Sequence, residues 1–148
     1  MKKVFFYILP IAFVSCVSHK QGLKKFQPIE GADKYEFIVP QGYAEEKRFA
    51  GGREYFSQEY YYPDSSVFYV TTFSNTPNYE EIRKQGTFYE RFDALNEGDT
   101  ITLSGVNEQG LYWKDRLLTR AVTIGYSKVP FNKISDFEKG ISSIRRVK

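Results

Sequence analysis

The sequence has little of the side-chain chemistry on which most enzymes depend. It contains one histidine, His19, and one cysteine, Cys16, both near the N-terminus. A zinc site or a catalytic triad needs several such side chains inside a folded domain, so sites built on histidine or thiol are not expected. Residues 51–53 lack the spacing of a phosphate-binding loop, and residues 96–99 lack the alternating ligands of a calcium loop. We therefore expect no metal and no cofactor.

The chain also lacks a strong charge of one sign. It carries 21 Lys and Arg against 18 Asp and Glu. A nucleic-acid-binding domain needs a basic stripe, so this near balance argues against nucleic acid as a partner. The basic residues at 145–148 are predicted to form a solvated end behind a helix, where positive charge is favourable.

No hydrophobic run is long enough to cross a membrane. Residues 4–14 are apolar throughout and follow Lys2 and Lys3. A spanning helix needs about 20 apolar residues, whereas this run has the length of a signal-peptide core. Small Ser15 and then Cys16 follow it directly, so the segment predicts export.

This pattern resembles the lipobox of bacterial lipoproteins, in which a small residue precedes a cysteine that is acylated before the signal is removed. Phe13 departs from the pattern, since Leu, Val or Ile is more usual there. The resemblance implies a signal peptide at 1–15, a lipid such as palmitate on Cys16, and a flexible tether over 16–33. The alternative is ordinary secretion, but residues 12–15 offer no pair of small residues for that cleavage.

The resemblance also implies a location in the cell envelope. Val17 is not acidic and no acidic run follows it. By the sorting rules of such lipoproteins, this favours an outer-membrane anchor with the domain facing the periplasm. The membrane and an envelope protein are then the expected partners.

Residues 34–148 are predicted to form a single globular domain. Alternating or β-rich runs predict strands at 35–39, 54–62, 67–73, 100–104, 111–114 and 117–128. Residues 63–66 predict a hairpin turn, and residues 114–116 a tight corner between two strands. Pro77 and Gly86 bound a short predicted helix at 76–86.

The C-terminal segment predicts an amphipathic helix. Its apolar face carries Ile134, Phe137, Ile141 and Ile144 at steps of three and four. Ser135 and Glu138 have the spacing of a capping box, and Gly140 is expected to allow close approach to a sheet. The candidate packing partners on the sheet are Leu103, Val122 and Ile124.

These elements predict an α+β fold, with an antiparallel sheet of about six strands, a short middle helix and a C-terminal helix packed on it. The pattern resembles the α/β/α sandwich of the PsbP/Mog1 type. The resemblance is carried by residues 37–40, 68–70, Trp113, 124–126 and 137–144. It implies a fold alone, because that fold carries no single activity.

Two groups of side chains are candidates for a site. Aromatics make up 18% of the chain, and adjacent strand residues point to opposite faces, so part of the hairpin should stay exposed as a binding surface. Its residues are Tyr60, Tyr61, Tyr62 and Tyr69. Cross-strand pairing that only stiffens the hairpin is the alternative, and we favour it.

The second group is a set of aspartates expected near loop ends: Asp64, Asp93, Asp99 and Asp115. Two carboxyl groups across a cleft can hydrolyse a glycosidic bond. No spacing ties any pair together, and aspartates commonly close turns. We therefore expect a non-catalytic envelope lipoprotein with a binding or assembly role. A carboxylate-based hydrolase of envelope glycan and a carrier of a small apolar ligand are the alternatives.

Overall fold

The computed structural model describes residues 22–28, 32–51, 55–72, 76–86, 93, 100–118 and 122–147. Its strands are β1 (Leu23–Phe26), β2 (Lys34–Ile38), β3 (Glu45–Gly51), β4 (Tyr55–Tyr61), β5 (Val67–Thr71), β6 (Thr102–Val106), β7 (Tyr112–Leu118), β8 (Val122–Val129) and β9 (Arg145–Val147). Its helices are α1 (Tyr79–Lys84) and α3 (Ile134–Ser142), the latter preceded by a 3-10 turn, η1 (Phe131–Lys133).

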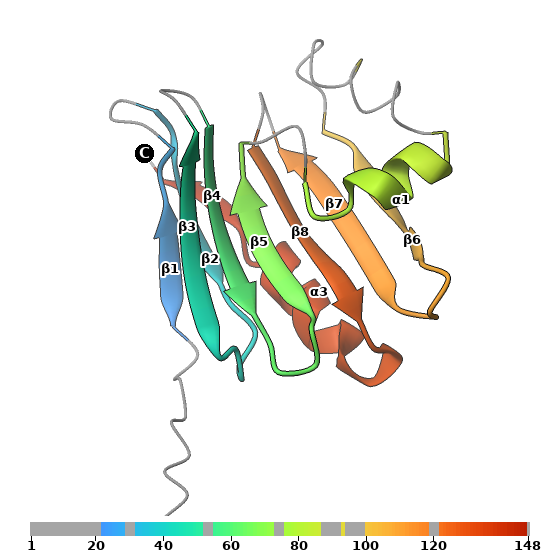
Figure 1. The fold of residues 1–148 in the computed structure, drawn as a ribbon. Coiled ribbons are helices and arrows are strands. Elements are labelled where there is room, and N and C mark those ends of the chain that lie inside the picture. Colours follow the sequence, from blue (N-terminus) through green and yellow to red (C-terminus); the bar gives the residue numbers. More distant parts are fainter. Residues whose placement is uncertain are drawn as a thin grey trace, which may run out of the picture.

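Six of these strands form one antiparallel sheet in the order β3-β4-β5-β8-β7-β6 (Figure 1). The predicted hairpin is confirmed, with Tyr61 opposite Val67 across β4 and β5. Asp64 closes its turn by accepting a hydrogen bond from the Ser66 backbone N–H at 3.1 Å. Ser65 adopts a positive φ of 68° in the same turn.

A second, three-stranded antiparallel sheet has the order β1-β2-β9. It lies with α3 against one face of the large sheet, while α1 lies on the opposite face (Figure 1). Ion pairs help hold its short strands in register. Arg145 pairs with Glu36 at 2.8 Å, Arg146 pairs with Asp33 at 2.5 Å, and Lys24 reaches across to Glu46 on β3 at 2.8 Å.

The main core lies between the large sheet and the layer made by the small sheet and α3. The predicted C-terminal helix is confirmed over Ile134–Ser142, and Phe137 and Ile141 are buried on it. Ile144, expected on its apolar face, lies beyond the end of the helix but still packs against the core. Gly140 permits the close approach, since a Cβ there would lie 2.9 Å from the Phe68 ring and 3.1 Å from the Ile38 carbonyl oxygen. The main core cluster consists of Phe26, Tyr35, Phe37, Val39, Tyr43, Tyr60, Tyr62, Phe68, Val70, Val122, Ile124, Tyr126, Val129, Phe137 and Ile141.

A smaller apolar cluster lies on the opposite face of the large sheet. Ile82 of α1 packs there against Leu103 and Trp113. Leu103 was a predicted partner of the C-terminal helix, and that prediction is wrong because its β6 position faces α1. Val122 and Ile124, the other two, do belong to the helix-covered core.

The predicted α+β sandwich of the PsbP/Mog1 type is wrong. In the residues described, the protein is mostly β, with nine strands in two antiparallel sheets. The sequence pattern missed β3 and β9, and residues 23–26 of the expected tether form β1. These three strands lack apolar alternation, and at least half of the residues in each are charged. All three are edge strands: β1 and β9 border the small sheet and β3 borders the large one.

Two local predictions also fail. The expected corner at residues 114–116 lies in the middle of β7, which is continuous from Tyr112 to Leu118. The capping box does not form, because α3 begins after Lys133 without a side-chain cap. Glu138 instead accepts hydrogen bonds from Lys114 at 2.7 Å and from the Tyr126 hydroxyl at 2.8 Å.

Candidate functional site

The paired strands β3 and β4 form a ribbon at one edge of the large sheet. They are in register from Glu45 opposite Tyr61 to Gly51 opposite Tyr55. Because strand residues alternate, one ribbon face turns toward β1 and the core and the other turns away from it. We call the second the outer ribbon face; it carries Lys47, Phe49, Ser57, Glu59 and Tyr61.

The side chains of the outer ribbon face hold one another in place. The Glu59 carboxylate accepts hydrogen bonds from the Tyr61 hydroxyl and from Ser57 Oγ, the latter at 2.9 Å. The Lys47 ammonium lies 4.7 Å from the centre of the Tyr61 ring. Burial and the bond to Glu59 raise the Tyr61 pKa, so its hydroxyl stays a neutral donor. Phe49 is 43% exposed, and the face therefore combines fixed polar groups with an accessible aromatic ring.

Of the four predicted binding tyrosines, Tyr61 alone has part of its side chain exposed. Tyr60 and Tyr69 are fully buried, and Tyr62 is 6% exposed. Tyr60 and Tyr62 pack edge-on against Tyr43, with ring centres 5.1 and 6.4 Å from it. Burial raises the pKa of both hydroxyls. The structure therefore divides the aromatic hairpin between the core and one partly exposed ring.

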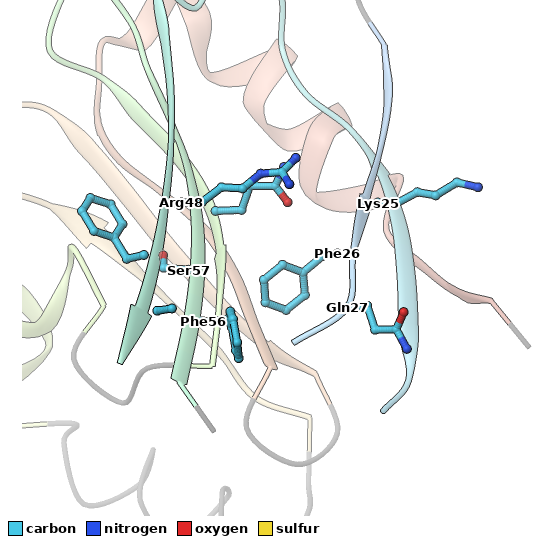
Figure 2. Close-up of a pocket in the computed structure, with 9 residues that line it drawn as sticks. Lys25, Phe26, Gln27, Arg48, Phe56 and Ser57 are labelled. Carbon is cyan, nitrogen blue, oxygen red and sulfur yellow. The ribbon is translucent and has the colours of Figure 1, made fainter. Parts of the chain in front are cut away.

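A cavity of about 270 Å³ lies between β1 and the ribbon. Figure 2 shows the rings of Phe26 and Phe56 turned toward one another at this cavity, with Arg48 above them and Lys25 directed away. Gln27 and Gln58 add polar atoms to the wall. The cavity thus has an apolar floor and a polar rim, and sequence reasoning missed it because β1 and β3 were not predicted.

One carboxylate, Glu46, organises the wall next to this cavity. It accepts hydrogen bonds from Lys24 at 2.8 Å, Gln58 at 2.9 Å and Arg48 at 3.1 Å. Burial works to raise the Glu46 pKa, but these donors outweigh it and the pKa is lowered. Burial likewise opposes the charge of Lys24, yet its bond to Glu46 leaves the Lys24 pKa raised. The pair is therefore charged at neutral pH and fastens β1 to the ribbon.

The predicted aspartates are not brought together. Asp64 lies in the β4–β5 turn and pairs with Lys133 at 2.5 Å. Asp93 is exposed, and Asp99 lies outside the described residues. Asp115 is 2% exposed in the middle of β7, well inside the sheet. Neither of the two pockets formed by described residues is lined by Asp64, Asp93 or Asp115.

Asp115 belongs to a group that we call the buried polar cluster, with Tyr69, Thr76 and Asn78. Asp115 accepts hydrogen bonds from the Tyr69 hydroxyl, from Thr76 Oγ1 at 2.8 Å and from Asn78 Nδ2 at 2.7 Å. Gly125 makes room for it, since a Cβ there would lie 2.5 Å from the Tyr69 hydroxyl. All four side chains are at most 5% exposed. Trp113, Asp115 and Leu117 alternate along β7 and all three are buried. Their period of two is the feature of the sequence that could have predicted a buried Asp115.

Cys16, the predicted lipidation site, and His19 lie outside the described residues. Within the described ranges, no helix is both long and apolar enough to cross a membrane. Nor do any three His, Cys, Asp or Glu side chains of that part of the chain gather as metal ligands would. Comparisons of the chain with protein-family models, with curated proteins and with solved structures find no match.

Proposed function

We propose that this protein is a lipid-anchored binding protein of the bacterial cell envelope, without catalysis of its own. Acylated Cys16 holds it in the membrane, and its domain faces the periplasm from the outer membrane. The apolar run at 4–14, with Ser15 ahead of Cys16, supports the anchor. The bound partner is an envelope protein.

The observation that carries the binding role is the edge strand β3 with its outer ribbon face. Among the described strands, β3 has a neighbour on one side only, so its other backbone edge can pair with an added strand. Exposed Phe49 lies on this strand and supplies an aromatic side chain, a class that is enriched at protein interfaces. Lys47, paired with Glu45 at 3.2 Å, adds the charge that limits indiscriminate edge pairing.

The carrier of a small apolar ligand is the second candidate. Phe26 and Phe56 provide an apolar floor in the cavity between β1 and the ribbon. Its volume of about 270 Å³ is just below the roughly 300 Å³ at which ligand pockets begin. A hydrolase has less support, because none of the residues that line this cavity carries a carboxylate, whereas paired acid chemistry needs two.

A site-specific crosslink tests the binding role. A photo-reactive amino acid replaces Phe49 in one variant and exposed Arg83 on α1 in a matched control. We expect an adduct with one envelope protein from position 49, absent from position 83 and lost on adding Lys47→Glu. Equal adducts from both positions, or none from position 49, would contradict a partner at β3.

The anchor is tested separately. Cys16→Ser should move the protein from the membrane fraction to the soluble fraction, and mass spectrometry should find acyl chains on Cys16 of the unaltered protein. An unmodified Cys16 in the mature protein, or cleavage at another position, would overturn the anchor.

A further inference from the structure

The chain enters the fold at one defined end of the molecule. Leu23, the first residue of β1, lies opposite Ile38 at the end of β2. The Tyr62 hydroxyl donates to the Pro40 carbonyl at 2.7 Å, which places the β4–β5 turn at this same end. Val67 then pairs with Ser127, and Tyr112 with Val129, so the ends of β8 and η1 lie there too. We call this the tether end (lower part of Figure 1).

The tether end carries four of the five large apolar side chains that are exposed in the described part of the chain. Leu23 is 53% exposed, Ile38 36%, Val106 49% and Phe131 77%. Leu23 and Ile38 are cross-strand neighbours. Val106 pairs with Tyr112, whose ring lies 6.1 Å from that of Phe131. Phe49, the other large apolar side chain that is similarly exposed, lies toward the opposite end of the ribbon.

The length of chain between Cys16 and β1 restricts how the domain can be oriented on a membrane. Seven residue steps separate Cys16 from Leu23, and a fully extended chain covers at most about 25 Å in that number. The eight residues of β8 span roughly 26 Å along the sheet. With the tether end toward the lipid, the connection has slack. With the opposite end toward the lipid, it would have to run fully stretched along the whole height of the sheet.

Charge at the tether end does not oppose a lipid surface. Asp64 is paired with Lys133 at 2.5 Å, Glu45 with Lys47 at 3.2 Å, and Glu108 with Lys84 at 3.0 Å. The carboxylates described at this end are thus accompanied by cations, and Lys128 at the end of β8 adds an exposed positive charge. Such a mixture of apolar side chains and neutralised charge suits the boundary between headgroups and acyl chains.

We propose that the tether end lies against the membrane, with Phe131 and the Leu23–Ile38 pair in contact with the lipid. This inference rests on the proposed lipid anchor at Cys16 and goes beyond it by assigning a membrane-contact surface and an orientation. The β3 edge near Phe49 and the cavity between β1 and the ribbon then point away from the membrane, toward the periplasm.

The test uses the full, acylated protein in vesicles of phosphatidylethanolamine and phosphatidylglycerol. Because Cys16 is the only cysteine and is consumed by acylation, one introduced thiol takes a polarity-sensitive fluorophore uniquely. Phe131→Cys and Phe49→Cys form a matched pair, since both replace exposed phenylalanines. We expect the fluorescence emission of the label at 131 to shift to shorter wavelength and to be quenched by spin-labelled lipids. The label at 49 should show neither change.

Vesicle flotation separates the two proposals. Protein that does not float overturns the lipid anchor, and the orientation falls with it. Protein that floats but gives equal quenching at positions 131 and 49, or stronger quenching at 49, overturns the orientation and leaves the anchor standing. A label at 131 that stays unquenched in vesicles but becomes protected in native envelopes identifies a protein partner at this surface and also overturns the lipid contact.

Discussion

The two faces of the large sheet are buried by different means. The face under α3 and the small sheet is aromatic, and Phe68, Tyr126 and Phe137 pack there with ring centres about 6 Å apart. On the opposite face, Tyr69 and Asp115 share a hydrogen-bond network beside the small apolar cluster of Trp113. The first face depends on apolar area and the second on matched donors and acceptors. Truncating a side chain should therefore cost stability through lost apolar burial on the first face and through unsatisfied hydrogen-bond groups on the second.

The largest loss of stability should come from removing an aromatic ring from the face under α3. Phe137 is 1% exposed, and Phe137→Ala should lower the free energy of unfolding by about 3–5 kcal/mol. Urea denaturation followed by fluorescence measures the change. Phe131→Ala removes the same ring from a site that is 77% exposed, and it should stay within about 0.5 kcal/mol of the unaltered protein. A loss below about 1 kcal/mol for Phe137→Ala would show that α3 does not close the core.

The polar face should respond to loss of its acceptor. Asp115→Ala leaves Tyr69, Thr76 and Asn78 without a shared acceptor, and we expect a loss of about 2–4 kcal/mol, because each unsatisfied buried group costs about 1–3 kcal/mol. Thermal and urea unfolding should agree on this value. Asp93→Ala, at an exposed position, is the control. An Asp115→Ala variant as stable as its parent would mean that the network adds nothing to stability.

The same glycine-to-alanine change on each face gives a direct comparison. A Cβ on Gly125 would lie 2.5 Å from the Lys114 carbonyl oxygen, so Gly125→Ala should cost about 1–3 kcal/mol through overpacking. Gly140→Ala meets the Phe68 ring at 2.9 Å but gains about 1 kcal/mol of helix propensity. The net loss of stability from Gly140→Ala should therefore be smaller than that from Gly125→Ala. The reverse order in a pair of denaturation curves would refute this ranking.

The smallest expected change in stability is the pH-dependent contribution of the Glu46–Lys24 pair. The Glu46 pKa is lowered below 4.5 in the folded protein, so the Glu46–Lys24 pair stabilises the fold above that value. This contribution is lost as pH falls from about 4.5 through the lowered pKa. For partly exposed groups it should amount to about 1 kcal/mol or less. Glu46→Gln should flatten the corresponding part of the pH profile, and an unchanged slope would exclude Glu46 as its source.

Sequence reasoning located the elements in which apolar residues recur at regular spacing and missed those without such spacing. The hairpin and the C-terminal helix follow from regular spacing of residues such as Phe68 and Phe137, and both are present. Strand β3 reads Glu-Glu-Lys-Arg-Phe-Ala-Gly, and nothing local distinguishes it from a polar loop. Its strand form depends on pairing with β4, which is a long-range condition.

The candidate site was predictable to a similar extent. Alternation placed Tyr61 on the opposite face from Tyr60 and Tyr62, which the burial of those two side chains bears out. The cavity between β1 and the ribbon forms where the two sheets meet, and no local residue pattern predicts that contact. Asp115 was assigned to a corner because charged neighbours suggested a turn, although Trp113 and Leu117 mark the same inward face.

The position of β1 has a mechanical consequence. In the proposed function the lipid is on Cys16, ahead of Leu23 in the chain, whereas Phe49 lies toward the far end of the ribbon. A partner that moves away from the membrane while bound there would pull β1 along its own axis. Its pairing with β2 from Leu23 to Phe26 would then be loaded in shear, with all its hydrogen bonds sharing the force. The same bonds pulled sideways would open one after another, so with the proposed anchor and partner site the β1–β2 pairing would be loaded in its more resistant direction.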